Sequence, residues 1–134
     1  MLAKPLHGWT NVSIGDFKER ASYLTDIPND CLDAFIYAVN KNLPVVVYFD
    51  AEGYDYLLVA CCFESYIVTT KEKLEVLQFD VGLIGLANEL INDIKKHIDE
   101  WSNWLSYRNH TKREIRKNKR VLMKKITKLK RILG

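Results

Sequence analysis

The sequence predicts an α+β fold, in which an antiparallel sheet of three to five strands has its helices on one face. Short runs rich in β-branched and aromatic residues follow one another closely, which is typical of an antiparallel meander. Longer stretches with apolar residues three or four positions apart stand before and after these runs and predict helices. The 134 residues suffice for one domain with a modest core.

The first elements are expected in the order strand, then helix. Residues 11–24 alternate loosely between apolar and polar types and predict one or two strands. The helix that follows is predicted from apolar positions that fall on one helical face: Leu32, Phe35, Ile36, Val39 and Leu43. Pro44 should end this helix, because a residue that precedes a proline avoids the α region.

The middle of the chain predicts the sheet. Residues 45–50 and 54–62 are apolar at alternate and at intervening positions, so both faces of these two strands are expected to be covered. Ala51–Gly53 would join them as a short hairpin, because Gly53 can adopt a positive φ. Residues 65–70 and 74–79 predict a third and a fourth strand.

One long helix is predicted from about residue 82 to residue 107, with Asp80 as its cap. Its apolar stripe has a spacing of three or four residues: Leu83, Ala87, Leu90, Ile94, Ile98, Trp101 and Leu105. Thr111 and Glu114 then have the spacing of a capping box and predict the start of a last helix. The stripe of that helix is formed by Ile115, Leu122, Ile126, Leu129 and Leu133.

Charge divides the chain into two predicted parts, an acidic α+β domain over residues 1–107 and a basic amphipathic helix over residues 108–134. Residues 1–107 hold 8 Lys/Arg against 16 Asp/Glu, a net charge of −8. Residues 108–134 hold 12 Lys/Arg against Glu114 alone, a net charge of +11. Such a basic helix suits a phosphate-rich partner such as nucleic acid or a nucleotide. It equally suits packing on an acidic body, its own or that of a neighbouring subunit. A membrane surface is less favoured, because residues 111–134 contain no Trp, Tyr or Phe.

Three carboxylates crowd the predicted hairpin turn: Asp50, Glu52 and Asp55. A calcium loop that began at Asp50 would need glycine at its sixth position and glutamate at its twelfth, where the sequence has Asp55 and Cys61. A solvated hairpin tip is therefore the favoured interpretation. As part of the acidic body, these carboxylates could also face a basic helix such as residues 111–133.

The chain is expected not to be an enzyme and to need no cofactor or metal. None of its three histidines stands near a G-x-S-x-G or cysteine signature, and no phosphate-binding glycine loop is present. The longest apolar run has eight residues and the start lacks the apolar region of a signal peptide, so a cytoplasmic location and no membrane span are expected. Cys31, Cys61 and Cys62 are interpreted as buried, reduced thiols.

Three stretches suggest a class of protein: ASYLTDIPNDCLDAF (21–35), VVYFDAEGYDYLLV (46–59) and DEWSNW (99–104). Together they resemble small accessory proteins of phages and mobile elements of low-GC Gram-positive bacteria, of the counter-defence kind. That resemblance implies either an anti-CRISPR inhibitor or a sponge for immune-signal nucleotides like the Thoeris anti-defence proteins. Its implied partner is a host defence protein or a phosphate-containing immune signal.

The leading hypothesis is thus an oligomeric, phage-type counter-defence protein of the host cytoplasm, which neutralises an immune component by stoichiometric binding. In its sponge form, Arg108, Arg113 and Arg116 would contact phosphates, and Phe79 or Trp104 would stack on a base. The alternative hypothesis is a regulator that binds nucleic acid through the basic C-terminal helix.

Overall fold

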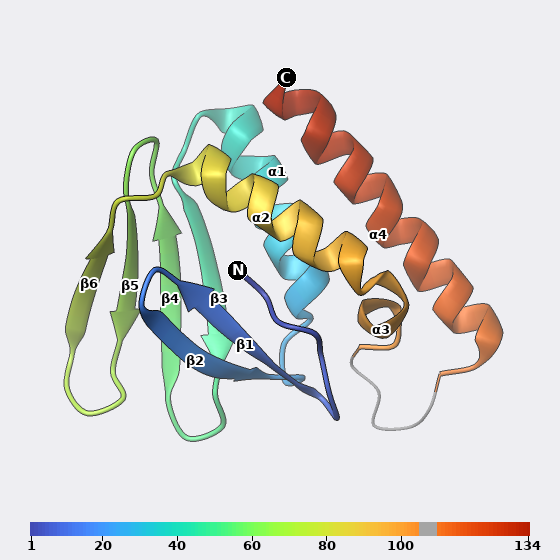
Figure 1. Ribbon diagram of the computed structural model, residues 1–134, viewed down its shortest axis with the longest axis horizontal. Helices are drawn as coiled ribbons and strands as arrows, with labels where there is room; N and C mark the ends of the chain where they lie inside the picture. The colour runs from blue at the N-terminus through green and yellow to red at the C-terminus, as the bar shows by residue number, and fades with distance from the viewer. Residues whose placement is uncertain (105–109) are drawn as a thin grey trace.

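The computed structural model describes residues 1–104 and 110–134 and confirms the predicted α+β fold (Figure 1). The strands of these residues are β1 (Trp9–Ile14), β2 (Phe17–Ser22), β3 (Val45–Asp50), β4 (Asp55–Ala60), β5 (Ser65–Thr69) and β6 (Glu75–Phe79). The helices are α1 (Ile27–Lys41), α2 (Leu83–Lys96), α3 (Ile98–Ser102) and α4 (Lys112–Leu133). The predicted boundary between residues 107 and 108 lies outside the described residues.

The main sheet is an antiparallel meander with the strand order β3-β4-β5-β6. Its register aligns Val47, Leu58, Ile67 and Leu77 across the four strands. The rows that contain these residues face the core, and the side chains of Val45, Phe49 and Tyr56 are buried among them. The alternate rows face the other way, where no helix among the described residues lies (Figure 1).

The hairpin of β1 and β2 covers part of the inner face of this sheet. The ring of Phe17 packs edge-on against the rings of Tyr56 and Phe79, with centroids 5.6 and 6.3 Å apart. The hydroxyl of Tyr56 donates a 2.9 Å hydrogen bond to the carbonyl oxygen of Arg20, which joins the two sheets. Helix α1 packs against β3 beside this hairpin.

Helix α1 ends before the chain reaches Pro44. Its last residue is Lys41, and Asn42 takes the left-handed conformation at φ 56°. The N–H of Leu43 then donates to the carbonyl of Ala38, at 2.9 Å, so that the end of the helix keeps a partner for an otherwise unpaired carbonyl.

The prediction of one helix from residue 82 to 107 is wrong, because the chain leaves the helical conformation at His97. His97 has φ −124° and ψ 40° and separates α2 from the short α3, which turns away from the axis of α2 (Figure 1). The N–H of Trp101 nevertheless donates to the carbonyl of His97, at 2.9 Å. The three-to-four spacing of apolar residues therefore persists through the break and could not reveal it. The cap of α2 is Gly82 rather than Asp80.

Helix α4 packs along α1 and α3, so that α1 lies between β3 and α4 (Figure 1). Its buried residues Leu122, Ile126 and Leu129 belong to the same hydrophobic core as the strands and α1. The cysteines bear out the burial prediction only in part, because Cys31 is buried but Cys62 is exposed; none of the three forms a disulfide.

Candidate nucleic-acid interface

The N-cap half of the capping box predicted at the start of α4 is present. The hydroxyl oxygen of Thr111 accepts a 3.1 Å hydrogen bond from the backbone N–H of Glu114. The carboxylate of Glu114 lies 2.8 Å from Nδ1 of His110, whose Nε2 lies 3.0 Å from the carbonyl oxygen of Trp104. These contacts orient the first turn of α4 relative to the end of the α3 region.

Two lysines and one asparagine fix the rotation of α4 about its own axis. Lys125 contacts Asp33 on α1, at 2.9 Å, and Lys119 contacts Asp99 on α3, at 3.1 Å. The amide of Asn118 donates to the carbonyl of Ser102, at 2.9 Å. The basic helix therefore does pack on acids of its own chain, but those acids lie on α1 and α3 and not in the turn around Glu52.

With α4 held this way, the side that points away from α1 is basic along its whole length. We call this side the cationic face. It consists of Arg113, Arg116, Lys117, Arg120, Lys124, Lys128 and Arg131, all of them exposed. Within the described part of the chain, none of these seven side chains forms an ion pair. The rise of an α-helix spreads them over about 27 Å.

Positive charge continues beside the cationic face, where Lys130 of α4 lies near α2. The neighbouring ammonium of Lys95, on α2, lowers the pKa of Lys130. Two lysines from different helices are thus close enough to repel each other. A multivalent anion that lay across them would relieve that repulsion.

The structure separates the residues that the sequence grouped as a nucleotide site. Arg113 and Arg116 are exposed in the first turns of α4, as a phosphate contact requires. Trp104 is buried, and its indole N–H donates to the carbonyl of Thr25, at 3.0 Å. Phe79 packs on Phe17 at the end of β6, which lies across the molecule from the start of α4 (Figure 1). Arg108 lies outside the described residues.

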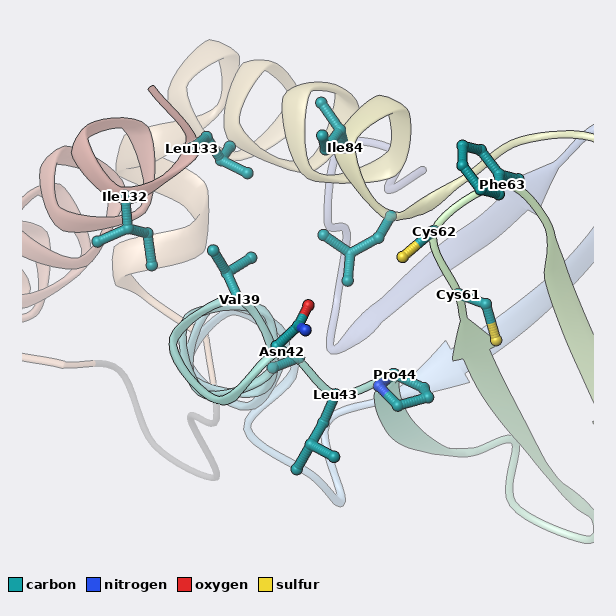
Figure 2. Close-up of a pocket in the computed structure, with 12 residues that line it drawn as sticks. Val39, Asn42, Leu43, Pro44, Cys61, Cys62, Phe63, Ile84, Ile132 and Leu133 are labelled. Atoms are coloured by element: carbon teal, nitrogen blue, oxygen red, sulfur yellow. The ribbon is translucent and has the colours of Figure 1, made fainter.

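A second surface feature was not foreseen from the sequence. An apolar cleft of about 380 Å³ opens where the ends of α1, α2 and α4 meet the turn between β4 and β5 (Figure 2). Its walls carry no charged side chain, and they include Val39, Ile84, Ile132 and Leu133. Phe63 stands at its rim and is 90% exposed. Since its walls come from four separate segments, no local pattern could have indicated the cleft.

Two carboxylates of the acidic turn between β3 and β4, those of Asp50 and Asp55, accept hydrogen bonds from the same hairpin. Asp50 accepts a 2.7 Å hydrogen bond from the N–H of Glu52, which stabilises the positive φ of Glu52. The hydroxyl of Tyr48 donates to Asp55, at 2.9 Å. This hydrogen bond is the main reason why the pKa of Tyr48 rises to about 12. The turn has the features of a hairpin tip rather than of a metal site, and no metal-binding cluster occurs among the described residues.

Glu19 forms a polar link between the two sheets. It accepts hydrogen bonds from the hydroxyl of Tyr54 and from the ammonium of Lys71, the latter at 3.0 Å. Partial burial by itself would raise the pKa of Glu19, but the hydrogen bonds and the charge of Lys71 outweigh it and lower the pKa. Arg20 stacks nearby over Trp9, 5.1 Å from the ring centroid.

Comparisons of the chain with protein-family models, with curated proteins and with solved structures give no match. None of the helices in the described residues has the length and apolar character that crossing a membrane requires.

Proposed function

We propose that this protein binds double-stranded nucleic acid through the cationic face of α4, without reading its sequence. The observation that carries the proposal is that seven exposed cations lie along one side of α4, and none of them is paired with an acid among the described residues. Their span of about 27 Å matches a stretch of duplex backbone that carries many phosphates, at one charge per about 1.7 Å of axis.

The composition of the face favours a duplex over a single strand. Proteins that bind single strands stack bases on aromatic side chains. The cationic face contains no aromatic residue, and the buried Trp104 is not available for stacking. Contacts to phosphates alone position a duplex but carry no sequence information.

The proposal is tested with the triple variant Arg120→Gln/Lys124→Gln/Lys128→Gln. Fluorescence anisotropy would measure its binding to a labelled 20-base-pair DNA or RNA duplex in about 50 mM salt, where phosphate contacts are strong. We expect at least a tenfold loss of affinity relative to the wild type. A matched control, Lys18→Gln/Lys41→Gln/Lys73→Gln, removes three exposed charges from other elements and should bind within about threefold of the wild type. Equal losses in both variants, or no binding by the wild type, would refute the proposal.

A counter-defence function is a second proposal, in the form of an inhibitor that docks on a defence protein. The observation that favours it is the uncharged apolar cleft with the exposed Phe63 at its rim, which suits an apolar side chain of a protein partner and not a nucleic acid. The test is phage plaquing on a Gram-positive host that carries a Thoeris or CRISPR defence system. Expression of the chain should restore plaquing, and Phe63→Asp should abolish that effect. Failure to restore plaquing against either system would count against this proposal.

A further inference from the structure

The apolar cleft and the cationic face meet at the last turn of α4. Arg131 is the final cation of the face, and the two residues that follow it, Ile132 and Leu133, form one side of the cleft (Figure 2). Lys128, one turn earlier, also belongs to the face. A ligand that fills the cleft and leaves its mouth on this side therefore lies on the cations of α4.

The mouth of the cleft is positive, although its walls are uncharged. Arg131 lies on the α4 side, and Lys41 lies on the α1 side, where it is exposed and forms no ion pair among the described residues. On the opposite side an acid, Glu64, follows Phe63, but its carboxylate accepts a 2.6 Å hydrogen bond from the side-chain amide of Gln78 on β6. Charge complementarity thus selects an occupant that carries anions beside its apolar part.

We propose that the cleft and the cationic face together bind one acidic segment of a partner protein. An apolar side chain of this segment fills the cleft as an anchor, and its carboxylates lie along α4. The inference rests on the second proposal above, that a protein docks at the cleft, and it names the chemistry of that protein.

The arrangement favours a protein segment over a nucleic acid and over a small amphiphile. A nucleic acid presents phosphates and polar base edges and has no large apolar group that would fill an uncharged cleft. Phe63 stands at the rim and is 90% exposed, so only an occupant that extends beyond the cleft covers it. The single head group of an amphiphile would also leave most of the cations of α4 without a partner.

The sizes of the two features define the segment. A cavity of about 150 Å³ holds a benzene molecule, so a cleft of about 380 Å³ has room for a large apolar anchor and part of its neighbour. An extended chain advances about 3.3 Å per residue, so about eight residues follow the 27 Å of the cationic face. The segment therefore has about ten residues, with an apolar pair at one end and acids along the rest.

The same seven cations would serve the acidic segment and a duplex. Binding of the two is therefore mutually exclusive, although only the protein segment uses the cleft. This difference separates the inference from the proposed binding of nucleic acid, because a change in the cleft should affect the segment alone.

The experiment measures the binding of labelled ten-residue peptides by fluorescence anisotropy in about 50 mM salt, where contacts between opposite charges are strong. One peptide has eight Asp or Glu residues followed by Phe-Leu, and a second has Phe-Leu first, so that both chain directions along α4 are sampled. We expect the better of the two to bind at least tenfold more tightly than the same peptide with Ser-Ser in place of Phe-Leu. An unlabelled 20-base-pair duplex that the protein binds should displace it.

Two kinds of variant separate the cleft from the cations. Phe63→Asp should lose at least tenfold in affinity for the peptide and keep its affinity for the duplex within about threefold, whereas Arg120→Gln/Lys124→Gln/Lys128→Gln should lose both. Leu74→Asp is the matched control, because Leu74 is 73% exposed in the β5–β6 turn and the substitution adds the same charge away from the cleft. It should bind both ligands as the wild type does.

Ile84→Ser changes the wall of the cleft without adding charge, and it should also weaken the peptide alone; Ile84 is 59% exposed, so the core stays intact. Equal binding of the Phe-Leu and Ser-Ser peptides overturns the inference, and so does unchanged peptide binding by both cleft variants. A duplex that binds without displacing the peptide overturns it as well. Binding of sodium decanoate, with no preference for the Phe-Leu peptide, would overturn it and assign the cleft to a small amphiphile. A wild type that binds the peptide in the expected pattern but does not restore plaquing supports the inference and refutes only the counter-defence role.

Discussion

Gly82 lies where the start of α2 touches the turn between β4 and β5. A Cβ atom at this position would lie 2.1 Å from the carbonyl oxygen of Cys62. The N–H of the next residue, Leu83, donates to the carbonyl of Cys61, at 2.8 Å. Close approach of two backbone segments, rather than a positive φ, is therefore what requires glycine here.

The substitution Gly82→Ala should accordingly destabilise the protein. The added methyl group meets backbone atoms that cannot rotate away, so we expect a loss of about 2–4 kcal/mol in the free energy of unfolding. Gly85→Ala, three residues further on, is the control. Its Cβ would have Val81 as its nearest neighbour, at 3.2 Å. It should change stability by less than about 1 kcal/mol, because alanine favours a helix more than glycine does. Urea unfolding of the two variants measures both values, and equal losses would contradict this account of Gly82.

Glu19 gives the stability of the protein a dependence on pH. Its pKa is lowered in the folded state, so its contribution is present above the pKa of the unfolded chain. That contribution is lost as the pH falls through the lowered pKa of the folded state. Because the side chain of Glu19 is only partly buried and its partner Lys71 is exposed, the effect should be about 1 kcal/mol or less.

We therefore expect Glu19→Gln to be less stable than the wild type at pH 7 and to approach it on acidification toward pH 3. Urea unfolding at several pH values measures the difference. Glu72→Gln, at an exposed position in the β5–β6 turn, is the control and should show no such convergence. A difference between Glu19→Gln and the wild type that stays constant with pH would argue against the charge of Glu19 as its cause.

Among the elements, the stability of α4 depends on its capped first turn, because the like charges along this helix repel one another. Eleven of its 22 residues are Lys or Arg. The cap at Thr111 and the packing of Leu122 and Ile126 on α1 and α3 offset that repulsion. Thr111→Ala should cost about 1 kcal/mol, the usual value of an N-cap.

Thr127→Ala tests whether that loss comes from the cap. Thr127 is exposed on the same helix, and its hydroxyl donates only to the carbonyl of Met123, four residues earlier. Its removal should change stability by less than about 0.5 kcal/mol. Thermal unfolding followed by circular dichroism compares the two variants. A Thr111→Ala protein as stable as the Thr127→Ala protein would show that the cap adds nothing.

Element patterns in the sequence predicted most of the fold, because periodicity reports which side of a helix or strand is apolar. The strands β3 to β6, the helix α1 and the capped α4 are all present near their expected residues. The break at His97 escaped prediction, because a single non-helical residue leaves the apolar spacing of Ile94, Ile98 and Trp101 unchanged. The choice of Gly82 as the N-terminus of α2 depends on contact with Cys62, which no local pattern records.

At the scale of the whole molecule, the sequence located the positive charge but not what that charge would meet. The split between an acidic and a basic part predicted a cationic helix, and Arg113 and Arg116 are exposed on it. Their contact with phosphates stays a prediction. The sponge hypothesis adds Phe79 or Trp104 to them, as the aromatic residue that would stack on a base. Phe79 packs on Phe17 and is partly buried, and Trp104 is buried against Trp101; both contacts arise from tertiary packing, which composition cannot show.

The cationic face and the bare outer side of the main sheet both follow from how the layers are arranged. Packing of α4 on α1 turns its seven cations outward, and packing of α1 and the β1–β2 hairpin on one side of the sheet leaves the other side bare. The sequence indicated that both faces of β3 and β4 would be covered. Among the described residues only the inner face is covered, so this part of the expectation is wrong.

The central claim, that the cationic face binds the phosphates of a duplex, is tested most directly by the salt dependence of binding. If five to seven of the cations contact B-DNA, the logarithm of the binding constant should fall against the logarithm of salt concentration with a slope of about −4.5 to −6.3. In Arg120→Gln/Lys124→Gln/Lys128→Gln the slope should be less steep by about 2.7, one step of about 0.9 for each lost contact. A slope that is near zero, or that the triple variant leaves unchanged, would contradict the claim.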